Sequence, residues 1–132
     1  MSEHTPVLLE EVLAALEVSA GGRYLDATFG RGGHTAQILE RAGEQGRVVA
    51  IDRDPEAIRA GKELFTASGA LAKGRLTLVS SPFSQVARVV REMGMSQGFN
   101  GVLLDLVATG FATRTSRTRE GICVALGTDR ID

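Results

Sequence analysis

Short apolar runs alternate along the chain with longer stretches in which apolar residues recur every three or four positions. The runs lie within GGRYLDAT, GRVVAIDRD, GRLTLVSS and GFNGVLLDL, and their lengths are typical of buried strands. Helical spacing follows each of the first three runs, and a further helix to about Glu17 precedes them, capped by Thr5 and Pro6. Strands that alternate with helices predict an α/β fold, with a parallel sheet and helices on both faces.

The regular alternation ends at Leu106. Residues 107–132 are rich in Thr, Gly and Arg, and only the stretch GICVAL is apolar enough to suggest one more strand. The sequence therefore divides into a regular part, residues 1–106, and a divergent tail, residues 107–132.

Composition and charge narrow the setting. The 132 residues fit one domain, and their formal net charge of −1 gives no overall attraction to nucleic acid or membrane, so an RNA partner needs a local patch. Cys123 is the only cysteine, and no apolar run approaches the roughly 20 residues that span a bilayer. These features predict a cytoplasmic protein that is not bound to membranes. With His4 and His34 as the only histidines, the sequence also predicts no metal cluster.

Three glycines fall within residues 30–33, in the loop FGRGGH that follows the first predicted strand. Glycines allow a sharp turn and a close approach of a ligand, and the next helix supplies unpaired N–H groups. The loop lacks the lysine and hydroxyl residue that end a phosphate-binding P-loop, and GRGGHT fails the dinucleotide pattern G-x-G-x-x-G at its last glycine. A branched side chain at Gly32 is expected to enter the ligand space.

Two acidic residues indicate which ligand this loop accepts. Asp26 precedes the loop by one turn, where its charge repels a pyrophosphate and attracts a cation. Asp52 ends the second predicted strand, about 20 residues after the loop, where nucleotide-binding sheets place the acidic residue that accepts two ribose hydroxyls. Together they predict a nucleoside site, and the sulfonium and amino groups of S-adenosylmethionine are cationic.

The segments HTPVLLEEVL, YLDATFGRGGHT, VVAIDRDPEAI, SPF and GVLLDL occur in this order between His4 and Leu106. In this order they resemble the MraW/RsmH-like family, bacterial methyltransferases that modify the N4 amine of a cytidine in the 16S RNA of the small ribosomal subunit. The resemblance implies a Rossmann-like methyltransferase fold, S-adenosylmethionine as cofactor and small-subunit ribosomal RNA as partner.

The family's cofactor contacts, carried over residue by residue, fall at the ends of predicted strands. They are Gly32, Gly33, His34, Asp52, Phe83 and Asp105. The resemblance gives the ribose to Asp52 and the adenine ring to Phe83. It places Asp105 near the methionine end of the cofactor or near the target amine, and Asp105 is the candidate catalytic residue. Simpler roles compete with these: His34 as a helix-start residue, Phe83 as part of the core and Asp105 as a loop cap.

After Leu106 the family continues with further cofactor, RNA and catalytic contacts that the tail lacks. A reading-frame shift explains this departure, because offset codons under FATRT and REGIC permit Ser-Gln-Leu-Glu and Arg-Gly-Phe, in the order that the family uses. This hypothesis predicts a poorly packed tail and a chain without methyltransferase activity of its own. The alternative is a basic arm that contacts RNA phosphates through Arg114, Arg117 and Arg119.

Two functions compete with a methyltransferase. One is a non-catalytic nucleoside-binding or RNA-associated module that retains the first half of the fold. The other is a nicotinamide-dependent oxidoreductase, which the missing third glycine of the dinucleotide pattern and the charge of Asp26 disfavour.

Overall fold

A computed structural model describes residues 9–92, 99–105, 112–117 and 122–127 of the chain. The helices in these ranges are α1 (Leu9–Leu16), α2 (Gly33–Ala42), α3 (Pro55–Thr66) and α4 (Val86–Glu92), the last preceded by a 3-10 turn at Phe83–Gln85. The strands are β1 (Arg23–Asp26), β2 (Arg47–Asp52), β3 (Leu76–Ser80), β4 (Gly101–Asp105), β5 (Ala112–Arg117) and β6 (Ile122–Gly127). The predicted alternation of strands and helices through β4 is confirmed.

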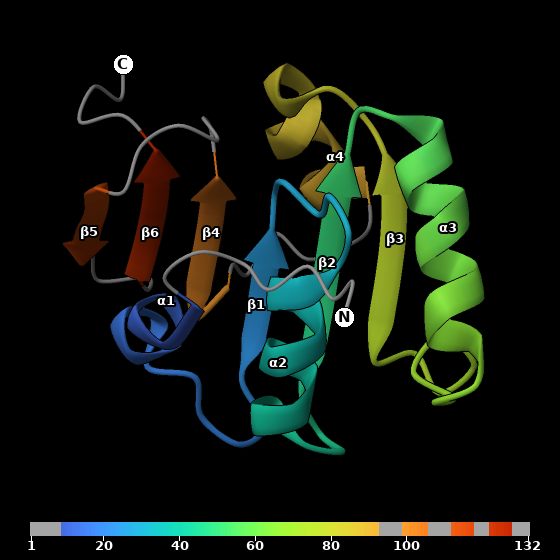
Figure 1. The fold of residues 1–132 in the computed structure, drawn as a ribbon, viewed down its shortest axis with the longest axis horizontal. Coiled ribbons are helices and arrows are strands. Elements are labelled where there is room, and N and C mark those ends of the chain that lie inside the picture. The colour runs from blue at the N-terminus through green and yellow to red at the C-terminus, as the bar shows by residue number, and fades with distance from the viewer. Residues whose placement is uncertain (1–8, 93–98, 106–111, 118–121, 128–132) are drawn as a thin grey trace, which may run out of the picture.

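The strands form one sheet in the order β3-β2-β1-β4-β6-β5 (Figure 1). All neighbouring pairs are parallel except β5 and β6, which are antiparallel. The chain builds outward from β1 to β3 and then returns across β1 to form β4. Strand order therefore reverses between β1 and β4, and open α/β sheets bind ligands beyond the carboxyl ends of the strands at such a reversal.

Apolar residues of the central strands face two separate cores. Along β2, Val48 and Ala50 belong to one buried cluster, whereas Val49 and Ile51 belong to the other. The first cluster receives α1, α2 and α3, and the second receives Val89 of α4. In Figure 1, α1 and α2 lie in front of the sheet. Helices thus cover both faces, as the sequence predicts.

Helix ends follow the local signals in the sequence. Asp54 caps α3 by accepting the backbone N–H of Glu56 at 3.0 Å, and Pro55 occupies the first turn. Gly43 ends α2 with a φ of 74°, in the conformation that favours glycine. The predicted cap of the first helix, at Thr5 and Pro6, lies outside the described residues.

The tail contributes two strands, of which the sequence predicted one. The stretch GICVAL forms most of β6, which pairs with β4 from Gly101↔Ile122 to Asp105↔Leu126. The sequence did not predict β5, the outermost strand, which pairs with β6 alone. An antiparallel edge strand needs no continuous apolar run, so hydropathy gives little signal for it.

Two leucines provide a matched test of the core. Leu103 of β4 is 0% exposed, whereas Leu64 of α3 is 60% exposed. We expect Leu103→Ala to lower the free energy of unfolding by about 2–5 kcal/mol. The same change at Leu64 should cost less than about 0.5 kcal/mol. Urea denaturation of both variants measures the difference, and equal costs would contradict the position of Leu103 in the core.

Candidate functional site

The loop that follows β1 crosses the carboxyl edge of the sheet at the reversal of strand order. The backbone N–H of Phe29 donates to the carbonyl of Ile51 in β2 at 2.8 Å, and that of Ala27 donates to the carbonyl of Leu103 in β4 at 2.9 Å. One bond ties the loop to the strand on one side of β1, and the other ties it to the strand on the opposite side. The glycine loop therefore lies where the fold predicts a ligand.

Two glycines of this loop have positive φ angles, 58° at Gly30 and 85° at Gly32. A Cβ at Gly32 would lie 2.9 Å from Cζ of Phe29, closer than real Cβ contacts allow. At Gly30 the nearest atom to an added Cβ is a backbone oxygen of Thr28, 3.9 Å away. Gly32 is therefore required by backbone conformation and by packing, and Gly30 by conformation alone.

This geometry corrects one expectation. The sequence predicts that a branched side chain at Gly32 enters the ligand space, but an added Cβ would instead meet the buried rings of Phe29 and Phe65. The sequence shows that a glycine occupies the position without showing the direction of the missing side chain.

The ring of Phe29 joins the loop to α3. It is buried, and its centroid lies 6.2 Å from that of Phe65, with the two rings tilted by 59°. A Cβ on Gly61 would lie 2.6 Å from the Phe29 ring, so α3 packs this closely because residue 61 is a glycine. Phe29 and Gly61 support the site, and the sequence analysis missed both.

Asp52 ends β2 beside the loop and joins three segments. Its Oδ2 accepts the backbone N–H of Gly30 at 2.8 Å, and its Oδ1 accepts that of Asp54 at 3.0 Å. Its carbonyl oxygen accepts the N–H of Ser81, after β3, at 2.9 Å. The side chain is partly exposed, and a carboxylate offers about four lone-pair positions, so Asp52 retains capacity for hydroxyl donors.

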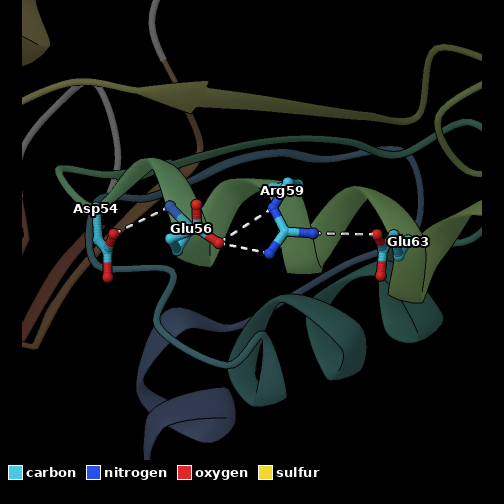
Figure 2. Close-up of polar contacts among 4 residues, drawn as sticks. All are labelled: Asp54, Glu56, Arg59 and Glu63. Carbon is cyan, nitrogen blue, oxygen red and sulfur yellow. Dashed lines mark hydrogen bonds and ion pairs between the residues drawn. The ribbon is translucent and has the colours of Figure 1, made fainter.

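Charged side chains continue from Asp54 along the exposed side of α3 (Figure 2). Arg59 donates to Glu56 and to Glu63, one turn on either side of it. The hydrogen bond to Glu56, followed by the charges of Glu56 and Glu63, raises the pKa of Arg59 above its usual value. These contacts satisfy Arg59 on the helix itself, while the Asp54 cap fixes the start of α3 next to Asp52.

A groove of about 410 Å³ adjoins Asp52, between the glycine loop and α3. Its lining residues are Phe29, Gly30, Arg31, Asp52, Asp54, Ala57, Ala60, Gly61 and Leu64. Among the predicted cofactor contacts whose side chains the structure describes, Asp52 alone lines it. The helical spacing of Ala57, Ala60 and Leu64 is the sequence signal for this side of α3.

The other predicted site residues take these positions. Gly32 is the N-cap of α2, Gly33 begins the helix, and His34 is buried in its first turn. Phe83 begins the 3-10 turn after β3, and Asp105 ends β4, but their side chains lie outside the described part of the structure. The backbone thus places all of these residues at or after carboxyl ends of parallel strands.

Among the described residues, no group of three or more His, Cys, Asp or Glu side chains is arranged to hold a metal ion. Within the same ranges, no helix has the length and apolar character needed to cross a membrane.

Comparison with known proteins identifies relatives. The sequence model of the MraW methylase family matches residues 1–117, so the match continues beyond Leu106, where the motifs in the sequence end. Similar solved structures include a protein of Clostridium thermocellum assigned as an rRNA methylase. It has a TM-score of 0.63 and 22% identity, over 78% of this chain and 55% of that one.

Two further structures share the fold. A SAM-dependent O-methyltransferase of Thermotoga maritima has a TM-score of 0.60 and 18% identity, over 90% of this chain and 48% of that one. A cyclopropane-fatty-acyl-phospholipid synthase-like protein of Lactobacillus casei has a TM-score of 0.59 and 24% identity, over 79% of this chain and 38% of that one. At these identities the likeness concerns the fold alone. The chain spans about half the length of the first two structures.

Alanine substitutions at Gly30 and Gly32 distinguish the cost of a positive φ angle from the cost of a packing collision. We expect Gly30→Ala to lower the free energy of unfolding by about 1–2 kcal/mol, the cost of a left-handed alanine. Gly32→Ala adds a collision with Phe29, so it should cost a further 1–3 kcal/mol or so. Thermal or urea unfolding of both variants compares them. A Gly32→Ala variant as stable as Gly30→Ala would show that the Phe29 ring moves aside freely.

Proposed function

The chain belongs to the MraW methylase family, and we propose that it is the cofactor-binding part of an S-adenosylmethionine-dependent methyltransferase. Its proposed substrate is the N4 amine of a cytidine in the 16S RNA of the small ribosomal subunit, in the cytoplasm. The proposal assigns cofactor binding to residues 1–106 and treats residues 107–132 as a divergent tail.

One observation carries the proposal: the Asp52 carboxylate lies beside the glycine loop at the reversal of strand order. Backbone amides from Gly30 and Asp54 hold its two oxygens in place. The lone pairs that remain suit the two hydroxyls of a ribose. Since Gly30 has no side chain and little lies near its missing Cβ, a ligand has room to approach this carboxylate. The residues present therefore fit the adenosine portion of S-adenosylmethionine.

The other proposed contacts follow from strand ends. Gly32, Gly33 and His34 lie at the start of α2. The N–H of Gly32 donates to the carbonyl of Phe29 at 2.9 Å, so the N–H groups of Gly33 and His34 are the ones proposed to contact the polar end of the cofactor. Phe83, after β3, is proposed to contact the adenine.

Asp105, at the end of β4, is the proposed catalytic residue. When bound, S-adenosylmethionine supplies a methyl group on a positively charged sulfur. The amine of cytosine is a weak nucleophile because its lone pair is conjugated with the ring. Positive charge would grow on its nitrogen as the bond to the methyl carbon forms and the bond from that carbon to sulfur breaks. A carboxylate at residue 105 stabilises that charge, and the remaining gain in rate comes from holding the reacting atoms in line.

Two neighbouring aspartates test the cofactor site. We expect Asp52→Asn to weaken S-adenosylmethionine binding by about 1–3 kcal/mol, because the amide nitrogen cannot accept the hydrogen bonds that one carboxylate oxygen accepts. Asp54→Asn is the control, because asparagine also caps helices and Asp54 has no proposed contact with the cofactor. Isothermal titration calorimetry measures the affinity of the original chain and of both variants for S-adenosylmethionine and for NAD. Unchanged affinity in Asp52→Asn removes Asp52 from the site, and preferential binding of NAD favours an oxidoreductase.

The substrate and the tail are tested together. We expect the 132-residue chain to bind S-adenosylmethionine but to transfer no labelled methyl group to small ribosomal subunits, because the tail lacks the family's downstream contacts. Label in N4-methylcytidine would contradict this inactivity while supporting the substrate, and label in another nucleotide would contradict the substrate.

Sequencing of the encoding DNA tests whether a reading-frame shift produced the divergent tail. An offset frame under residues 107–132 should encode a continuation like that of the family. Without such a continuation the reading-frame hypothesis fails, and cofactor binding without transfer then favours a nucleoside-binding module.

A further inference from the structure

A buried hydrogen bond joins the end of β1 to the first turn of α2. Asp26 and Thr35 are both 0% exposed, and the Thr35 hydroxyl donates to Oδ2 of Asp26 at 2.7 Å. The other carboxylate oxygen, Oδ1, accepts the backbone N–H of Thr28 at 3.1 Å. One side chain therefore holds both ends of the glycine loop.

A carboxylate at this position is costly unless its hydrogen bonds are made. Removing a charged group from water costs several kcal/mol, and the group is retained only where donors replace the lost water. Asp26 receives a hydroxyl and an amide, and it lies next to the N-terminus of α2, where the helix dipole favours negative charge. Because Asp26 is fully buried, its side chain is out of reach of direct contact with a ligand.

The loop between these two attachments is fixed residue by residue. Asp26 holds Thr28, the carbonyl of Ile51 holds Phe29, and the carboxylate of Asp52 holds Gly30. Only a few residues therefore separate the Asp26–Thr35 bond from the bond between Gly30 and Asp52.

We propose that Asp26 and Thr35 are positioning residues: their hydrogen bond holds the glycine loop in the shape that binds the cofactor, and neither side chain contacts the cofactor. The inference rests on the proposed function, since it concerns the affinity of the same site. It differs from a direct electrostatic attraction between Asp26 and the sulfonium, because it makes the hydroxyl of Thr35 as necessary as the carboxylate.

Two substitutions at residue 35 distinguish the hydroxyl from simple packing. Thr35→Val keeps the shape of the side chain and removes the donor, whereas Thr35→Ser keeps the donor and removes a methyl group. If Thr35 only fills space, the serine variant is the more damaged one. If it positions the loop, Thr35→Val should bind S-adenosylmethionine roughly 5- to 100-fold more weakly, and Thr35→Ser should stay within about threefold of the original chain.

The matched control is Thr66→Val, at the end of α3. Its hydroxyl also donates within the protein, to the carbonyl of Lys62, but it is exposed and α3 separates it from the loop. We expect Thr66→Val to bind S-adenosylmethionine with unchanged affinity. A loss equal to that of Thr35→Val would show that any threonine hydroxyl has this effect, and would overturn the inference.

Hydrogen exchange of the ligand-free chain gives a readout that does not depend on the cofactor. The amides of Thr28 and Gly30 should exchange faster in Thr35→Val than in the original chain, and at the original rate in Thr35→Ser and Thr66→Val. Unchanged exchange in Thr35→Val overturns the inference whatever the affinities are.

A 2′-deoxy analogue of S-adenosylmethionine separates positioning from contact. Thr35→Val should weaken binding of both compounds and still prefer S-adenosylmethionine to the analogue, whereas Asp52→Asn should abolish the preference for the ribose hydroxyl. If the original chain binds neither compound, the proposed function fails. If the original chain binds S-adenosylmethionine and Thr35→Val binds it equally well, the positioning role alone fails.

Discussion

The ring of Phe29 lies between the glycine loop and α3, in space left by two residues without side chains. A Cβ on either Gly32 or Gly61 would lie within 3 Å of this ring. Because neither glycine has a side chain, the loop at Gly32 and the helix α3 at Gly61 can both pack closely against the Phe29 ring. Packing against Phe29 also fixes the loop that carries the Gly30 amide to Asp52. One of the two amides that hold the Asp52 carboxylate thus depends on a packing contact within the first core.

Asp26 and Asp52 end neighbouring parallel strands but have different environments. Asp26 is fully buried and accepts hydrogen bonds from Thr28 and Thr35, so its surroundings fix the loop. Asp52 is partly exposed, and only backbone amides hold its oxygens among the contacts described above. Burial explains why Asp26 supports the loop while Asp52 can accept a ligand. A carboxylate without access to water leaves no position for an incoming ligand.

The similar structures share with this chain the sheet that carries the candidate site. Structures with 18–24% identity share the sheet and its helices, although their names describe different substrates. The common element is therefore the arrangement of strands that creates the reversal of strand order. In proteins that share a fold, the reaction depends on the side chains placed around such a site. In this chain the proposed site residues all lie within the family match, residues 1–117.

The sequence by itself determined the alternation of strands and helices, the caps of α2 and α3, and the placement of Asp52 at a strand end beside the glycine loop. These features depend on local periodicity, on turn residues and on the rule that parallel strands share a carboxyl edge. It did not predict β5, because pairing at a sheet edge leaves little trace in hydropathy. Only the tertiary structure decided that a side chain at Gly32 would face the Phe29 ring, that Gly61 makes room for this ring, and that Asp26 bonds to Thr35. Each of these facts concerns the direction in which a side chain points from one segment toward another. Packing in three dimensions sets that direction.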